Sequence, residues 1–327
     1  MKKSIFKIFY IVYIVILLVL ICTGLFWVYD CCDKYQNNSS ETLIDNVIEK
    51  LKEEKGIITT CDNVPSIDEN GNTNYILRSN KTEIAKITLK KTGNTLIVLP
   101  LLEIVDITPL RTYNIITASK DISFSINNKE VNYSYTDYDY SSIPFFNELN
   151  KSLYTFPDLY ITTISNVYDL SEINIEENKD LFKVNDDTYI LLEKLDNLKQ
   201  EKIKEKAIYL IKKYSSYIGG ELSKDEILSY TQYYSPLNAR LSLYKAFYTH
   251  HDSISLNDLE ISDAYLLAND YYLINAKYTF ITTIDDDEIV DNTTLSLVLH
   301  DNGYSYSLSE ISNYFYFDLK DFTKIDY

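Results

Sequence analysis

Several residue types that carry chemistry are scarce in this sequence. Its 327 residues include 7 glycines, 3 histidines, 4 cysteines, 1 methionine and 1 tryptophan. Few glycines leave few loops that can cradle phosphate, and few histidines leave few general bases or metal ligands. The signatures G-x-G-x-x-G, G-x-x-x-x-G-K-[ST], H-E-x-x-H and C-x-x-C are all absent. These absences exclude P-loop hydrolases, Rossmann dehydrogenases, zincin proteases and thiol oxidoreductases with their usual signatures, and no cofactor is expected.

Positive charge is also in short supply. Lys and Arg number 31 against 48 Asp and Glu, which gives a net charge of −17. A chain this acidic binds phosphate backbones poorly, so we expect no nucleic-acid partner. Tyrosine is abundant, at 31 residues, and together with many Ile, Lys and Asn residues it indicates an AT-rich genome.

The cysteines do not form the pattern of a disulfide framework. Cys22 lies in an apolar run, Cys31 and Cys32 follow that run, and Cys61 stands alone. Adjacent cysteines make a strained pair. The pattern favours free thiols, and the alternative is a disulfide between protomers at a membrane surface.

The apolar run at the N-terminus predicts a transmembrane helix over residues 8–29. No charged residue lies between Lys7 and Asp30, and as a helix these 22 residues measure about 33 Å, close to a hydrocarbon core of about 30 Å. A cleaved signal peptide has a shorter apolar region that ends at small residues, whereas this run ends in Phe26, Trp27 and Tyr29, which resemble an aromatic belt. We therefore expect an uncleaved anchor.

Charges beside this run predict its orientation. Lys2, Lys3 and Lys7 precede it, while Asp30 and Asp33 follow it. The positive-inside rule then places residues 1–7 in the cytoplasm and everything after the span outside the cell membrane. The exported part carries 28 basic and 48 acidic residues, about −20, which argues against lying flat on anionic lipid.

The region after the span is predicted to be mainly β. Residues 30–40 are polar and aperiodic and predict a stalk, and a helix from Ser40 to a stop at Gly56 follows. Strand-like runs begin at residue 75, with hairpin signals at Gly93-Asn94 and Asn127-Asn128. Further strands are expected at 159–164 and 189–192. We assign 41–195 to a membrane-proximal domain with its connector, whose boundary lies between 145 and 195.

Three helices and then strands are predicted from residue 196 to the C-terminus. The first helix ends at Gly219-Gly220, Ser223 and Glu226 form a capping box for the second, and Pro236 opens the third. In the first strand the even positions from 272 to 280 form the more apolar face, and Asn302-Gly303 indicates a two-residue hairpin later in the sheet.

This order of elements resembles the nuclear transport factor 2-like cone fold. The stretches that carry the resemblance are 201–218, 235–249, 264–283 and 293–312. The whole layout is similar to that of membrane-anchored exported proteins of clostridia and other Firmicutes, of conjugation-transfer proteins of Gram-positive mobile elements, and of secretion-channel components. The resemblance implies an α+β protein in which residues 196–327 form the cone domain. Because this fold hosts enzymes, ligand pockets and interaction modules, it names no activity.

Two clusters are weak candidates for a metal site. His250 and His251 lie at the predicted end of the third helix, and Asp285, Asp286 and Asp287 lie at a predicted hairpin tip. Histidines at a helix C-terminus complement the dipole, and charges at a hairpin tip are normally solvated. We therefore predict neither metal ligands nor catalytic residues.

Three aromatic residues of the cone are expected to form core or cavity wall: Tyr272, Tyr278 and Phe280. With 31 tyrosines, a tyrosine–aspartate pair of the kind that cone-fold isomerases use arises by chance. His300 falls on the less apolar strand face, and Asp68 to Asn72 is interpreted as a turn, since it lacks the glycine and glutamate spacing of an EF-hand.

Together these features predict a non-enzymatic, single-pass envelope protein that interacts with other envelope proteins or with itself, for example in a transfer or secretion complex. The alternative is a cone cavity that binds a small apolar or envelope-derived ligand, with acid/base chemistry from a buried aspartate.

Overall fold

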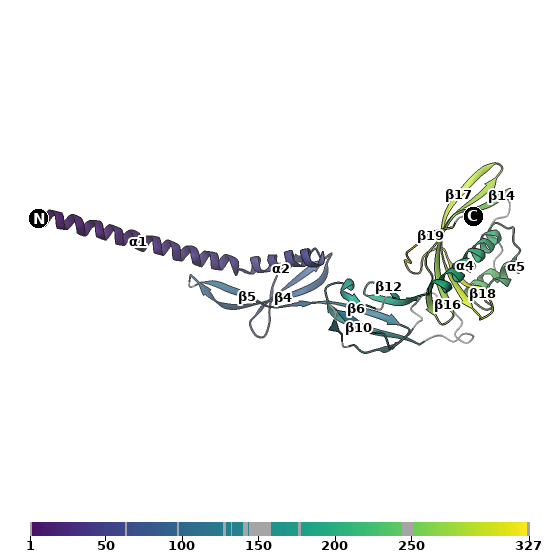
Figure 1. Cartoon of the computed structure of the whole chain (residues 1–327), viewed down its shortest axis with the longest axis horizontal. Helices are drawn as coiled ribbons and strands as arrows, with labels where there is room; N and C mark the ends of the chain where they lie inside the picture. The colour runs from purple at the N-terminus through teal and green to yellow at the C-terminus, as the bar shows by residue number, and fades with distance from the viewer. Residues whose placement is uncertain are drawn as a thin grey trace. The chain divides into compact units, whose positions relative to one another are not determined.

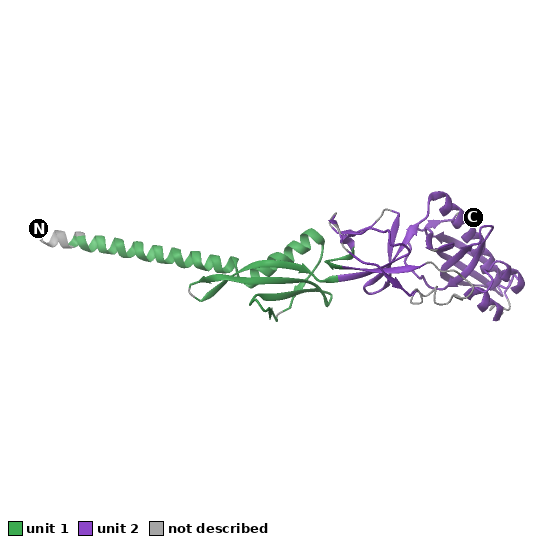
Figure 2. Ribbon diagram, turned by 90° about the horizontal axis from the view of Figure 1, so that it is seen from below, with its two compact units in different colours: residues 1–111, 165–170 green, residues 112–164, 171–327 purple. Residues whose placement is uncertain are grey.

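The computed structural model describes residues 2–62, 64–96, 98–126, 129–131, 133–139, 143, 158–175, 178–243 and 251–325. The chain divides into two compact units, which Figure 2 colours separately. Unit 1 comprises Met1–Arg111 and Ser165–Leu170, and unit 2 comprises Thr112–Ile164 and Ser171–Tyr327. Both α-helices and a large β-sheet content are present, so the predicted α+β class is confirmed at this level. The proposed division at residues 40 and 195 stays a prediction.

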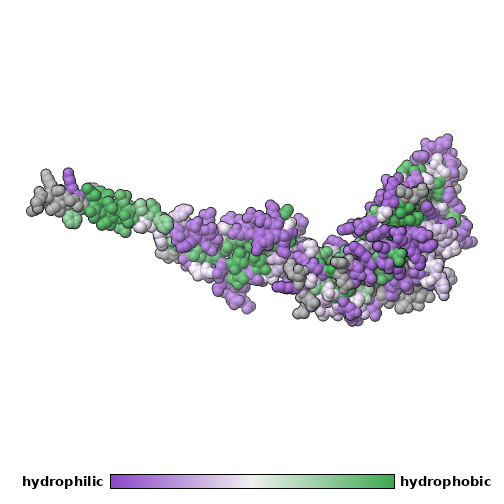
Figure 3. Space-filling model, in the orientation of Figure 1, coloured by the Kyte–Doolittle hydropathy of each residue, from purple (hydrophilic) through white to green (hydrophobic). Residues whose placement is uncertain are grey.

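Helix α1 (Lys2–Asn37) carries the apolar run. Over Phe9–Asn37 it is long and apolar enough to cross a membrane, and none of its most apolar stretch is buried. Figure 3 shows a continuous green band of apolar residues along the middle part of this helix. Side chains of this kind without protein neighbours are typical of a segment that lies in lipid.

The predicted stalk at residues 30–40 is wrong over most of its length, because α1 continues through Asn37 without a break. The segment contains neither glycine nor proline, and Lys34 Nζ lies 2.7 Å from the Asp30 carboxylate one turn earlier. Pairs at this spacing support a helix. Only Asn38 and Ser39 separate α1 from α2 (Ser40–Lys55), and Ser39, rather than Ser40, is the N-cap.

Unit 1 packs α2 on an antiparallel sheet. The sheet contains β1 (Thr60–Cys61), β2 (Ser66–Ile67), β3 (Thr73–Ser79), β4 (Thr82–Thr95) and β5 (Leu99–Pro109). The helix places Ile44, Val47 and Leu51 on buried strand residues such as Leu77 and Ile87. Gly56 ends α2 with φ 66°, as the sequence predicted, because glycine adopts the left-handed conformation without a Cβ penalty.

The predicted hairpin turn at Gly93-Asn94 is wrong. Both residues lie within β4 and pair with Leu101 and Pro100 of β5. Gly93 instead accommodates an irregularity in the strand pairing, and the connection begins after the Thr95–Leu99 pair. The second predicted hairpin, Asn127-Asn128, lies outside the described residues, although the strands on either side of it, β7 (Ser125–Ile126) and β8 (Lys129–Glu130), pair antiparallel.

Unit 2 is built on one extended sheet in the order β18-β17-β16-β15-β13-β6-β10-β9. Both strands predicted between residues 159 and 192 are present. The bounds are β6 (Arg111–Thr117), β9 (Thr136–Tyr138), β10 (Leu159–Val167), β11 (Ile173–Asn174), β12 (Lys179–Asn185), β13 (Thr188–Lys194), β14 (Ser253–Ile261), β15 (Tyr265–Ala268), β16 (Tyr271–Ile284), β17 (Asp287–Asp301), β18 (Tyr306–Ser312) and β19 (Thr323–Lys324), with a short 3-10 helix at Leu170–Glu172.

The three predicted helices are present as α4 (Asn197–Ile218), α5 (Lys224–Ser229) and α6 (Pro236–Leu243). The capping box of Ser223 and Glu226 is formed in full. Gly219 and Gly220 follow α4, and Gly220 has φ 78°. Residues 244–249, the remainder of the stretch 235–249 in which the third helix was expected, lie outside the described residues. Figure 1 shows α4 beside β16 and β18, with which it is in contact.

Strand β16 is buried on both faces. Its even residues, including Tyr272 and Ile274, pack against α4 in one core. Its odd residues Tyr271 and Leu273 pack in a second core that includes Phe182. The sequence indicated only the even face, because the partners of the odd face come from strands far away in the chain.

The two hairpin tips of this sheet differ. Asp285 and Asp286 have φ 51° and 70°, which corresponds to a tight two-residue turn with both residues left-handed. The predicted two-residue hairpin at Asn302-Gly303 is wrong, because Asp301 pairs with Tyr306 and four residues connect them. The Asn302 side chain accepts hydrogen bonds from the backbone N–H of Tyr304 and Ser305, which closes this longer loop.

Candidate functional site

A cavity of about 390 Å³ opens between α4 and the sheet of unit 2. We call it the helix–sheet pocket. Helix α4 contributes three residues, and adjacent strands contribute alternate residues, which point to the same side of the sheet. The lining residues are Tyr214, Ser215, Ile218, Tyr278, Phe280, Asp291, Thr293, Leu295 and Asn313.

Ser215 is the most informative residue of this pocket. Only 4% of its surface is exposed, and its hydroxyl has no hydrogen-bond partner. A buried hydroxyl without a partner is unfavourable, because folding removes its water without replacing it. A polar ligand atom would restore the missing hydrogen bond once the hydroxyl turned towards the cavity.

Tyr214, beside Ser215, is strongly affected by its surroundings. Burial raises the pKa of its phenol to about 12, since the phenolate loses its water. The nearby Tyr278 and Glu310 contribute in the same direction, and Arg240 opposes them. Tyr214 is therefore a neutral hydrogen-bonding group at ordinary pH rather than a proton acceptor.

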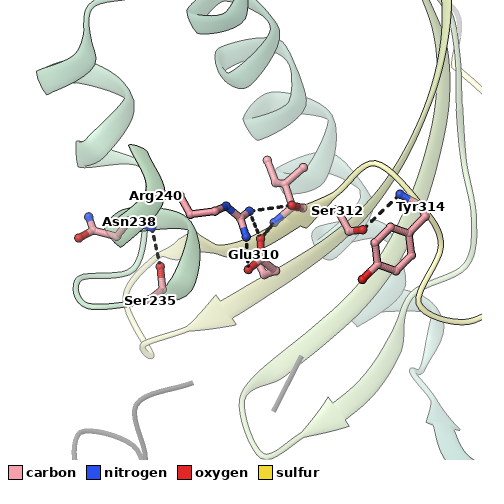
Figure 4. Close-up of polar contacts among 7 residues, drawn as sticks. Ser235, Asn238, Arg240, Glu310, Ser312 and Tyr314 are labelled. Atoms are coloured by element: carbon pink, nitrogen blue, oxygen red, sulfur yellow. Dashed lines mark hydrogen bonds and ion pairs between the residues drawn. The ribbon is translucent and has the colours of Figure 1, made fainter. Parts of the chain in front are cut away.

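Arg240 and Glu310, whose charges both act on the Tyr214 phenol, form the ion pair shown in Figure 4. Glu310 lies on β18 with a fully buried carboxylate, and Arg240 reaches it from α6. The guanidinium donates to both carboxylate oxygens, with Nη1–Oε2 at 2.9 Å, and also to the Ile311 carbonyl oxygen at 2.9 Å. The Ile311 N–H adds a hydrogen bond to Glu310 Oε1 at 2.7 Å. These contacts join α6 to β18 and occupy the carboxylate, which favours a structural role over general-base catalysis.

A second cavity, of about 380 Å³, lies along an earlier stretch of α4. We call it the tyrosine–lysine groove. It is formed by α4, the end of α5 and the connection between β17 and β18. The lining residues are Lys202, Lys206, Tyr209, Leu210, Ser229, Tyr230, Asp301, Gly303, Tyr304, Ser305, Tyr306 and Ser307.

Lysines and tyrosines of this groove lie against one another. The Lys202 ammonium is 5.0 Å from the centre of the Tyr306 ring. Lys213, which does not line the groove, is 5.5 Å from the rings of both Tyr209 and Tyr230, which do. Such contacts are cation–π interactions. Tyr304 is fully exposed at the rim. The groove thus presents aromatic surface and positive charge on an otherwise acidic chain.

The three aromatic residues expected at a cavity wall fall in two places. Tyr278 and Phe280 line the helix–sheet pocket. Tyr272 is only 1% exposed and belongs to the core around α4. The Lys199 ammonium lies 4.7 Å from the centre of its ring.

The two weak metal candidates are neighbours in space. His250 lies outside the described residues, but His251 precedes Asp252, whose carboxylate accepts a hydrogen bond from the Asp285 N–H at 2.8 Å. Asp286 and Asp287 continue from there into the exposed hairpin. Within the described part of the chain, no three His, Cys, Asp or Glu side chains gather in a way that could hold a metal ion.

The remaining polar residues singled out in the sequence have structural contacts. Asp68 accepts hydrogen bonds from the backbone N–H of Asn70 and Asn72, which confirms a turn. His300 stacks on Tyr271 with ring centres 4.8 Å apart, and burial lowers the pKa of its imidazole. Within one copy of the chain, all four cysteines are free thiols.

Comparisons with protein-family models, with curated proteins and with solved structures found no match to this chain. The candidate sites therefore rest on geometry. Sequence reasoning missed Ser215, although a serine at the buried face of α4, four residues after Ile211, was a usable signal. It also missed Arg240 and Glu310, whose pairing has no local signal.

We predict that Arg240→Met lowers the free energy of unfolding by about 3–5 kcal/mol, because the buried Glu310 carboxylate loses its guanidinium partner. Arg240→Met combined with Glu310→Leu is expected to recover most of that stability. Urea denaturation of the full chain in detergent, followed by circular dichroism, measures both. The control is Lys183→Met, which removes an ion pair whose partner Asp186 is fully exposed and is expected to cost about 1 kcal/mol or less. Equal effects of the two single variants would contradict the prediction.

The raised pKa of Tyr214 predicts a loss of stability at high pH. Below about pH 10 the phenol keeps its proton in both the folded and the unfolded chain. Between there and the folded pKa of about 12, the unfolded chain releases a proton that the folded chain keeps, so the free energy of unfolding falls as pH rises. Denaturation measured across this pH range should show that the free energy of unfolding falls less steeply with pH in Tyr214→Phe than in the unmodified chain. Tyr304→Phe, which changes a fully exposed tyrosine, is the matched control, and identical slopes for the two variants would refute the assignment.

Proposed function

We propose that this chain is a single-pass envelope protein, with a cytoplasmic N-terminus and both units outside the membrane, that binds another envelope protein or a second copy of itself. The observation that carries this proposal is α1, whose large apolar side chains between Phe9 and Tyr29 are exposed. The three lysines before the span support the orientation.

The tyrosine–lysine groove supports a binding role for unit 2. Tyrosine is enriched in protein interfaces because it contributes a large rigid surface with a polar tip. The exposed tyrosines of this unit include Tyr209, Tyr233, Tyr234, Tyr304 and Tyr314. Lys202 and Lys206 at the groove favour a partner that offers carboxylates.

We further propose that residues 196–327 form a nuclear transport factor 2-like cone, as part of a transfer or secretion complex in a clostridial or related envelope. The order of three helices before the long antiparallel strands supports this proposal, as does the packing of α4 on β16 and β18. The fold itself remains neutral about activity.

A photo-crosslinking amino acid placed at Tyr304 is expected to form an adduct in intact membranes, because this residue stands at the rim of the groove. The mass of the adduct distinguishes an envelope protein from a second copy of the chain. The same amino acid at Tyr314, just beyond the opposite end of β18 and also exposed, is the control. Adducts of equal yield at both positions, or none at Tyr304, would argue against the groove as the binding surface.

The second candidate function is ligand binding in the helix–sheet pocket, and the buried hydroxyl of Ser215 favours it. Acid/base chemistry there would need a carboxylate, and the one that lines the pocket, Asp291, is exposed. The pocket suits a small aromatic or aliphatic molecule with one polar group.

Phenol and toluene test this alternative, since they share a ring and differ in one hydroxyl. We expect the full chain in detergent to bind phenol more tightly than toluene. Ser215→Ala is expected to weaken phenol binding roughly fivefold, about 1 kcal/mol, and to leave the affinity for toluene unchanged. Ser216→Ala, a neighbouring change outside the pocket lining, is the control in the same calorimetric titration. Equal affinity for both molecules in the unmodified chain would remove the support for a polar ligand.

A further inference from the structure

The hairpin formed by β4 and β5 lies alongside the end of α1. The Leu102 N–H donates to the Asn38 carbonyl oxygen at 3.1 Å, and the Thr95 hydroxyl donates to the Cys31 carbonyl oxygen at 3.5 Å. Asn38 directly follows α1 and stands seven residues after Cys31, about 10 Å along the helix axis. The hairpin therefore runs back along α1 towards the N-terminus, as Figure 1 shows.

The burial of Cys31 on α1 shows how far along the helix the hairpin reaches. Cys31 is only 7% exposed, while the neighbouring Cys32 is exposed. The uncharged run of α1 ends at Tyr29, only about 3 Å further along the axis. Because Thr95 and Leu99 are the last paired residues, the connection between them lies level with the end of the span.

The composition of this connection is unusual for a hairpin tip. Turns are normally rich in Gly, Asn, Asp and Ser, but residues 96–102 contain only Leu, Ile, Val and Pro. Val98 is 75% exposed, and Leu96 and Leu99 are partly exposed. Ile97 lies outside the described residues. Lys90 and Lys91, both exposed, precede the tip on the β4 arm and lie further from the span.

We propose that the tip of this hairpin, Leu96, Val98 and Leu99, enters the membrane interface beside α1. This inference rests on the proposed anchor and adds a second point of attachment to it. The apolar side chains then leave water, while Lys90 and Lys91 reach towards lipid phosphates. Insertion is shallow, because the unpaired backbone groups of the turn need water or headgroups as partners. Two attachments restrict rotation of unit 1 about the axis of α1.

The single native tryptophan makes a direct test possible. Trp27 lies in the span, so its fluorescence in vesicles made with brominated phosphatidylcholine reports whether α1 is inserted. In a Trp27→Phe background, Val98→Trp reports on the hairpin tip. Ile67→Trp, on β2, is the matched control, because Ile67 and Val98 are both 75% exposed.

We expect brominated lipid to quench Trp27 in the unmodified chain and Val98→Trp in the variant, and to leave Ile67→Trp unchanged. Quenching of Trp27 without quenching of Val98→Trp would overturn the hairpin insertion and leave the anchor intact, whether the tip lies in water or against a second copy. Absence of quenching at Trp27 itself would overturn the anchor and this inference with it. Pro100→Trp, on the exposed second arm of the tip, repeats the measurement independently.

Discussion

The uncharged apolar stretch of α1 between Lys7 and Asp30 is the constraint on which the organisation of this protein depends. A helix whose exposed side chains are aliphatic and aromatic from Phe9 to Tyr29 is stable in lipid, where its backbone groups are already paired with one another. The continuation of α1 to Asn37 then lets unit 1 pack directly on the end of the helix, without a flexible stalk between them.

In unit 2 the corresponding constraint is the burial of β16 on both faces. Tyr272 and Ile274 pack under α4, while Tyr271 and Leu273 pack in the opposite core. Within the sheet, Asn275 is fully buried and satisfied, because its side chain donates to the Phe317 carbonyl oxygen and accepts from Ser296. Both the helix–sheet pocket and the tyrosine–lysine groove lie at the margins of the α4 core. Their side chains are therefore positioned by rigid elements, which suits binding of a defined partner or ligand.

Local signals predicted local structure well. The stop at Gly56 and the capping box of Ser223 and Glu226 depend on atoms within one helical turn, and both are present. Local sequence signals failed where a contact with a distant part of the chain overrides the local preference. Gly93-Asn94 has the chemistry of a turn, yet pairing with Leu101 and Pro100 keeps both residues in β4. Ser215 was overlooked because its burial depends on strands that follow more than sixty residues later.

The sequence by itself determined that this chain has an N-terminal segment fit to span a membrane, a mixed α+β composition and a set of well-capped helices. It did so because hydrophobic length, period and capping are properties of neighbouring residues. Only the tertiary structure decided that the β4–β5 hairpin lies against α1, that the odd face of β16 is buried and that Arg240 meets Glu310. The Arg240–Glu310 pair alone joins residues 70 positions apart, and no local pattern specifies which distant partner a buried side chain will meet.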